Sequence, residues 1–113
     1  VKQPPNLSFA YELIVAITNE GCTDMVMNAA RAAGARGGTT LHGKGTGEKD
    51  PKFYNITLAE EKEVVLIVAA AAQKSEIMAS ILKKAGPDTE AGTIVFSLPT
   101  TEVAGFGLLE ANF

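Results

Sequence analysis

Two short segments of the chain are apolar on both faces of an extended strand. Residues 11–18 alternate Leu, Val and Ile on one face with Ile and Ala on the other, and residues 64–68 read Val-Val-Leu-Ile-Val. Successive side chains of a strand point to opposite faces, so such runs are typical of strands buried on both sides. The pattern predicts two central strands, one at 11–18 and one that begins near Ile56 or Lys62 and ends at Ala70.

Two other segments carry apolar residues at helical spacing. Between residues 25 and 33, and again between residues 77 and 82, apolar side chains recur at spacings of one, three and four. This spacing predicts helices at about 23–33 and 73–85. A glycine follows each segment, as is typical where a helix ends.

Shorter segments at 38–42 and 93–98 predict two further strands. The resulting order, β-α-β-β-α-β, predicts a ferredoxin-like α+β sandwich, an antiparallel four-stranded sheet with two helices on one face. The first and third strands form the inner pair of that fold, in agreement with their two apolar faces. We expect the whole chain, 1–113, to be one domain, with 1–10 as a flexible lead-in and 43–55 as a long loop.

One apolar face of the predicted sheet has no helix to cover it. An exposed apolar patch of that size is unusual on a monomer. The pattern therefore predicts an oligomer in which subunits pack sheet against sheet. The alternative is that the tail after Pro99 folds over this face.

Composition excludes several classes of function. The chain of 113 residues has a formal net charge of −3 and no basic stripe, which argues against nucleic-acid binding. Its apolar runs are too short to span a bilayer, and its one cysteine cannot form an internal disulfide. No secretory signal precedes the first strand. We therefore expect a cytoplasmic protein that is not inserted in a membrane.

A glycine-rich segment at 34–47 is the strongest candidate for a binding site. Six of the chain's 11 glycines lie there, beside Arg36 and Lys44. Glycine lets the backbone approach a ligand closely, and successive backbone N–H groups can form a concave anion site. The segment predicts a phosphate-ligand site that leads into the 43–55 loop. The alternative is a helix end followed by a tight turn, and the glycine spacing does not fit a P-loop.

The chain resembles the PII signal-transduction superfamily, in particular the short PII-like nitrogen regulator proteins. The resemblance rests on four segments of the sequence: 34–39, 43–47, 63–68 and 92–96. It implies a non-enzymatic homotrimer that binds an adenine nucleotide in the clefts between subunits. It further implies a T-loop, here 43–55, that docks on a membrane transporter or a metabolic enzyme.

The resemblance assigns two groups of residues. Those expected at the nucleotide are Gly37, Gly38, Thr39, Gly45, Gly47, Gly92 and Thr93. Lys62 joins them because it could reach a bound phosphate, although residues 60–63 are otherwise expected to form a solvated edge. The residues expected to contact a partner through the loop are Lys44, Thr46, Glu48, Lys49, Lys52 and Tyr54.

Two departures from the family pattern concern the charge of the ligand. Residues 90–93 read Glu-Ala-Gly-Thr where the family has Gly-Asp-Gly-Lys, and residues 100–106 carry no basic residue where the family has paired arginines. A triphosphate would therefore lose charge-assisted hydrogen bonds, which are the strong ones. Among ADP, AMP, ATP and cyclic AMP, the sequence favours a mono- or diphosphate or the cyclic nucleotide, and a different ligand stays open. The family's glutamine that helps to hold 2-oxoglutarate has no counterpart after Gly47, so the sequence does not support sensing of 2-oxoglutarate.

Two other classes of function stay open as alternatives. A small ferredoxin-like enzyme is one, although the chain has no paired acid and base at a suitable spacing and we assign no catalytic residue. A CutA-type metal-tolerance trimer is the other, although a single His42 and a single Cys22 are too few for a metal site. We interpret His42 as a polar residue at a strand end and Cys22 as a small residue at a turn. Whether Cys22 or Tyr54 is modified stays open.

Overall fold

The computed structural model describes residues 10–44 and 61–104. Its elements are β1 (Tyr11–Asn19), α1 (Thr23–Ala32), β2 (Thr39–Lys44), β3 (Glu61–Ala70), the 3-10 turn η2 (Ala71–Gln73), α2 (Lys74–Ala85) and β4 (Ile94–Pro99). The predicted β-α-β-β-α-β order is confirmed, with η2 as an addition before the second helix. β2 extends to Lys44, two residues beyond the predicted end.

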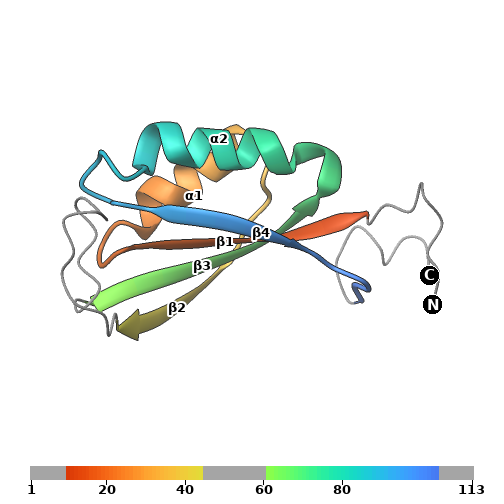
Figure 1. Ribbon diagram of the computed structural model, residues 1–113, viewed down its shortest axis with the longest axis horizontal. Coiled ribbons are helices and arrows are strands. Elements are labelled where there is room, and N and C mark those ends of the chain that lie inside the picture. Colours follow the sequence, from red (N-terminus) through yellow and green to blue (C-terminus); the bar gives the residue numbers. More distant parts are fainter. Residues whose placement is uncertain (1–9, 45–60, 105–113) are drawn as a thin grey trace.

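The four strands form one antiparallel sheet in the order β2-β3-β1-β4. The prediction that the first and third strands are the inner pair is therefore confirmed. Both helices lie on the same face of this sheet (Figure 1). The fold class expected from the sequence, a ferredoxin-like sandwich, is the one observed.

The core lies between the helices and the face of the sheet that they cover. Ile14 and Ile67 are opposite each other in β1 and β3 and are both fully buried. From the helices, Val26 of α1 and Ile77 and Ile81 of α2 are also fully buried against them. These side chains contribute the apolar burial that stabilises the domain.

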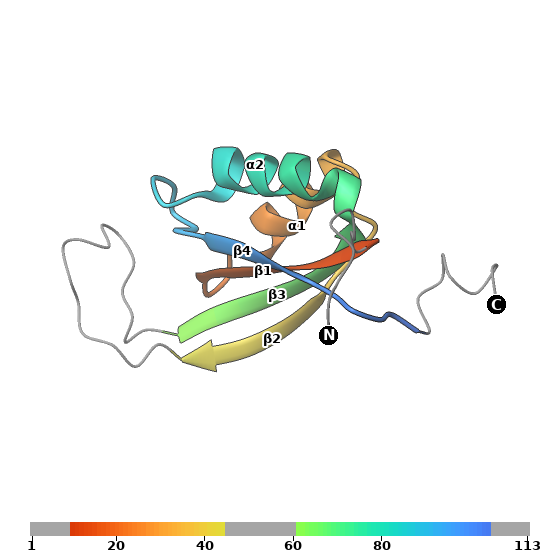
Figure 2. The same ribbon diagram turned by 45° about the vertical axis from the view of Figure 1, so that its right-hand side comes forward.

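The opposite face of the sheet, which we call the open sheet face, is also apolar. Strand register places ten apolar residues on it: Leu13, Val15, Ile17, Leu41, Val64, Leu66, Val68, Ile94, Phe96 and Leu98. Within residues 10–44 and 61–104, no helix covers this face (Figure 2). Leu41, Phe96 and Leu98 are exposed large hydrophobic side chains there. An apolar surface of this kind marks an interaction site more often than a free surface.

Several sequence predictions fall outside the described residues. Gly45, Thr46, Gly47, Glu48, Lys49, Lys52 and Tyr54 all lie there. The same holds for the lead-in at 1–9 and for residues 105–113, so the alternative in which the tail covers the open sheet face stays untested. In the part of the chain that the structure describes, no helix is long and apolar enough to span a membrane.

Candidate functional site

The α1–β2 connection borders a hollow at the edge of the open sheet face. This edge hollow has a volume of about 410 Å³. It is lined by Arg36, Gly37, Gly38, Thr39, Leu66 and Val68. Three of the residues predicted at the nucleotide, Gly37 to Thr39, therefore lie together at one concave surface. The floor comes from the apolar side chains of β3, and the rim comes from the connection.

The two glycines of the rim differ in what surrounds them. A Cβ on Gly38 would lie 2.9 Å from the Leu66 carbonyl oxygen and 3.1 Å from Cγ1 of Ile67. A Cβ on Gly37 would meet nothing within 4 Å. Gly38 therefore lets the connection pass close to β3, whereas Gly37 leaves open space beside the hollow.

Lys62 lies at the other end of β3 and is buried. Its side chain is only 6% exposed, and Nζ donates a hydrogen bond to Oδ1 of Asn19. The expectation of a solvated edge is wrong for this residue, because register places it beside Asn19 at the end of the open sheet face. Among the described residues, no carboxylate forms a salt bridge with Lys62. Asn19 is the hydrogen-bond partner of Lys62 in the described part of the chain, and a buried ammonium with a neutral partner is well placed to attract an anion.

Asn19 is a residue that the sequence analysis missed. Its Oδ1 accepts a hydrogen bond from Lys62, and its Nδ2 donates a hydrogen bond to the Glu90 carbonyl oxygen at 3.0 Å. It thereby joins Lys62 to the turn before β4, and we call Asn19 and Lys62 together the Lys62 corner. A polar residue at the end of an apolar strand was the available signal.

In the turn before β4, the backbone N–H groups of Gly92 and Thr93 are hydrogen-bonded within the protein. The amide of Gly92, which has a φ of 55°, donates to the Thr89 carbonyl, and that of Thr93 donates to Ala85. The Thr93 side chain is fully buried, and its hydroxyl donates to Oγ1 of Thr18. Gly92 and Thr93 were predicted to contact the nucleotide, but in this conformation neither offers a free hydrogen-bond donor to a phosphate.

One chain does not bring the edge hollow and the Lys62 corner together. Thr39 pairs with Leu66 and Gly43 pairs with Lys62, so the two places are four residues apart along β3. At roughly 3.3 Å per residue the separation is about 13 Å. A ligand confined to the edge hollow therefore does not reach the Lys62 corner of the same subunit.

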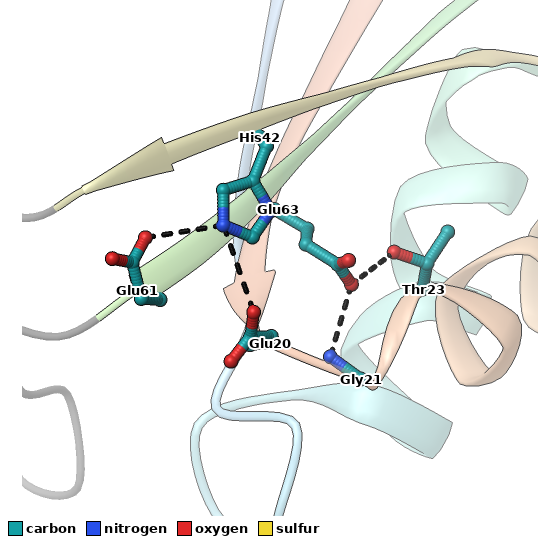
Figure 3. A network of polar contacts seen from close by, with 6 residues as sticks. All are labelled: Glu20, Gly21, Thr23, His42, Glu61 and Glu63. Carbon is teal, nitrogen blue, oxygen red and sulfur yellow. Dashed lines mark hydrogen bonds and ion pairs between the residues drawn. The ribbon is translucent and has the colours of Figure 1, made fainter.

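A second polar network joins β2, β3 and the N-terminus of α1 (Figure 3). His42 Nε2 lies 3.1 Å from Oε2 of Glu61 and 3.6 Å from Oε2 of Glu20. Oε1 of Glu63 accepts from the Gly21 amide at 3.1 Å and from the Thr23 hydroxyl at 2.6 Å. Among residues 10–44 and 61–104, no three His, Cys, Asp or Glu side chains are grouped to hold a metal ion.

Cys22 occupies the N-cap position of α1 but is not activated by it. Burial raises the pKa of its thiol, and the nearby carboxylates of Glu90 and Glu63 raise the pKa further. A raised pKa lowers the fraction of thiolate, which is the reactive form. The surroundings therefore agree with the interpretation of Cys22 as a small turn residue rather than a nucleophile.

Glu63 joins β3 to the start of α1 through its bonds with the Gly21 amide and the Thr23 hydroxyl, and its replacement makes a pH-dependent prediction. The Thr23 hydroxyl, and then the Gly21 amide and His42, lower the pKa of the Glu63 carboxyl. Because the pKa is lower in the folded state, this stabilisation is present above the ordinary pKa of glutamate and is lost as the pH falls through the folded value. We expect Glu63→Gln to cost about 1 kcal/mol in urea unfolding at pH 7 through weaker hydrogen bonds, and much less at pH 3.

Glu61→Gln is the matched control, since among the described residues the Glu61 side chain contacts only His42, at the surface. Exposed pairs of this kind contribute little, so we expect a change below about 0.5 kcal/mol at either pH. An equal loss for Glu63→Gln at pH 7 and pH 3 would show that the carboxylate charge is not involved.

The fold and the glycine-rich connection define a class of small ferredoxin-like proteins with a hollow at the sheet edge. A family model described as nitrogen regulatory protein P-II matches residues 11–106. The chain belongs to this P-II family, whose members are signalling regulators. The resemblance inferred from the sequence is thereby confirmed.

Two solved structures share the fold at low sequence identity. Arabidopsis thaliana PII bound to citrate superimposes with a TM-score of 0.65 at 21% identity, covering 85% of this chain and 80% of that one. A functionally unknown protein from Pediococcus pentosaceus gives a TM-score of 0.62 at 17% identity, covering 88% of this chain and 100% of that one. No curated protein matches the chain in sequence. At these identities the two structures support the fold and not a particular ligand.

Proposed function

We propose that this protein is a cytoplasmic homotrimeric regulator that binds a small anionic effector between its subunits. The effector is of the adenine-nucleotide class, and the 43–55 segment passes the signal to a transporter or a metabolic enzyme. The observation that carries the proposal is that the chain has two partial sites. The edge hollow has space and an apolar floor, and the Lys62 corner has a buried cation without a carboxylate partner among the described residues.

Assembly through the open sheet face would complete these partial sites. The edge hollow borders that face through Leu66 and Val68, and Lys62 lies at the end of the same face. When subunits pack around a shared axis, the hollow of one chain can meet the Lys62 corner of the next. A ligand held by two subunits would then contact both an apolar floor and a cation.

The properties of the hollow favour a small organic anion. Its volume of about 410 Å³ is within the range of small-molecule sites. The Arabidopsis PII structure, which shares the fold, contains citrate, a small polyanion of the class proposed here. The turn before β4 adds no free donor from Gly92 or Thr93, so a long phosphate chain would lack partners there.

The Lys62 corner is also placed to transmit a signal. Lys62 is paired with Gly43, and the neighbouring pair is Glu61 with Lys44. These residues are the ends of the two strands that lead into and out of residues 45–60. An effector at Lys62 would therefore act on the base of the segment that the family resemblance identifies as the partner-binding loop. A ligand that binds two conformations of this segment unequally would shift their populations.

Isothermal titration of the full chain with AMP, ADP, ATP, cyclic AMP and citrate tests the proposal. We expect at least one nucleotide to bind, and Lys62→Gln to weaken that binding about tenfold through loss of a charge-assisted hydrogen bond. Lys83→Gln, on the exposed side of α2, is the control and should bind as the wild type does. No binding of any of these compounds at millimolar concentration would contradict the proposal.

A further inference from the structure

We infer that Arg36 selects the ligand of the edge hollow, and that this ligand carries one terminal phosphate monoester on an uncharged body. The inference rests on the proposed function and specifies the effector that the site takes. In this arrangement the body lies on Leu66 and Val68, and the phosphate lies at the rim against the guanidinium. The class of compound is therefore a nucleoside monophosphate rather than a triphosphate or a cyclic diester.

Arg36 has no competing partner in the described part of the chain. It is exposed and lines the hollow, and no carboxylate among those residues forms a salt bridge with it. Its neighbours on the rim, Gly37 and Gly38, have no side chains to block access to the guanidinium. By contrast, Lys74 is paired with Glu12 at 3.5 Å. Arg36 is thus the cation that the edge hollow itself provides.

The chemistry of the guanidinium fits a phosphate monoester. Its planar fork can donate two parallel hydrogen bonds to two oxygens of one phosphate, which gives geometric selectivity as well as affinity. A monoester carries a charge of about −1.5 to −2 at pH 7. A cyclic diester carries a single charge and has fewer free oxygens, so it would gain less from Arg36.

The floor of the hollow contacts the uncharged part of the ligand. Leu66 and Val68 present only apolar side chains, which bury a ring face but form no hydrogen bonds with ring edges. The floor therefore provides contact area without reading the identity of a base. The contact between Arg36 and the charged end of the ligand therefore determines which compounds bind.

The cations available to the hollow match a single phosphate group. Arg36 lies at its rim, and the proposed assembly brings Lys62 of the next chain to the same ligand. Two cations balance the charge of one phosphate monoester, so each additional phosphate of ADP or ATP would add charge without a further cation from these residues. We therefore expect ATP to bind no more tightly than AMP.

Titration of Arg36 variants of the full chain with AMP, adenosine and ATP tests the inference. We expect Arg36→Gln to weaken AMP binding about tenfold or more, and Arg36→Lys to retain part of it because the charge stays while the fork is lost. Adenosine, which has no phosphate, should bind wild type and Arg36→Gln equally. Arg31→Gln, on the exposed side of α1, is the matched control and should leave AMP binding unchanged.

The outcomes separate this inference from the proposed function. If Arg36→Gln binds AMP as tightly as wild type while Lys62→Gln does not, the selecting role of Arg36 is wrong and the regulatory site stands. If ATP or cyclic AMP binds wild type more tightly than AMP, the monoester assignment is wrong. If wild type binds no nucleotide, both the proposed function and this inference are overturned.

Discussion

Replacing Leu98 with aspartate is expected to convert the protein from an oligomer to single chains of 11.8 kDa. Leu98 is 50% exposed in the single chain and lies on the open sheet face, opposite Leu13 of the inner strand β1. If subunits pack through this face, the substitution places a carboxylate among apolar side chains without a cation beside it. Burying an uncompensated charge costs on the order of 3 kcal/mol or more, which raises the dissociation constant by at least about a hundredfold.

Leu82 supplies an unusually close control for this experiment. It is 47% exposed, nearly the same as Leu98, but it lies on α2 in the helical layer rather than on the open sheet face. Leu82→Asp should therefore leave the assembly intact. Light scattering at micromolar concentration measures the mass of both variants. A wild-type protein that is already monomeric, or a Leu82→Asp variant that dissociates equally, would contradict packing through the sheet.

The same substitution separates a site within one subunit from a site between subunits. If the edge hollow needs the Lys62 corner of a neighbouring chain, Leu98→Asp should lose nucleotide binding together with assembly. Neither Leu98 nor Phe96 lines the hollow, so a direct effect on the ligand is not expected. Full binding by a monomeric variant would mean that one chain is sufficient for the site.

The fold was predictable because its determinants are local and periodic. The apolar runs that include Val15 and Leu66 identified the two inner strands, and the spacing around Val26 and Ile77 identified the helices. The topology then followed from the order of elements, since the inner pair must be apolar on both faces. The addition of η2 was not predictable from this pattern, because a single 3-10 turn has too few residues to show a period.

The site was predictable only in part, because spacing does not show where a side chain points. Gly37 and Gly38 line one concave surface beside Arg36, and their contact with a nucleotide stays a prediction. The glycine pattern gave no indication that Thr93 turns inward to Thr18. It also gave no indication that Lys62 is buried against Asn19, because that contact depends on strand register over 43 positions of sequence.

Replacing Gly38 with alanine is expected to destabilise the fold and weaken binding in the edge hollow, whereas the same change at Gly37 should do neither. The added Cβ would lie 2.9 Å from the Leu66 carbonyl oxygen and 3.3 Å from Sδ of Met27. The methionine can yield, but the carbonyl belongs to the backbone of β3, so the start of β2 must move outward. Overpacking of this kind typically costs about 1–3 kcal/mol.

The comparison with Gly37 distinguishes close packing from a general need for glycine. A Cβ added at Gly37 would have open space around it, and the residue does not have a left-handed φ. Gly37→Ala should therefore keep wild-type stability or gain a few tenths of a kcal/mol from reduced freedom of the unfolded chain. Thermal unfolding at one fixed protein concentration gives the stability of both variants, and AMP titration gives their binding. Equal behaviour would mean that the rim tolerates displacement from β3, and that the shape of the hollow does not depend on the close approach at Gly38.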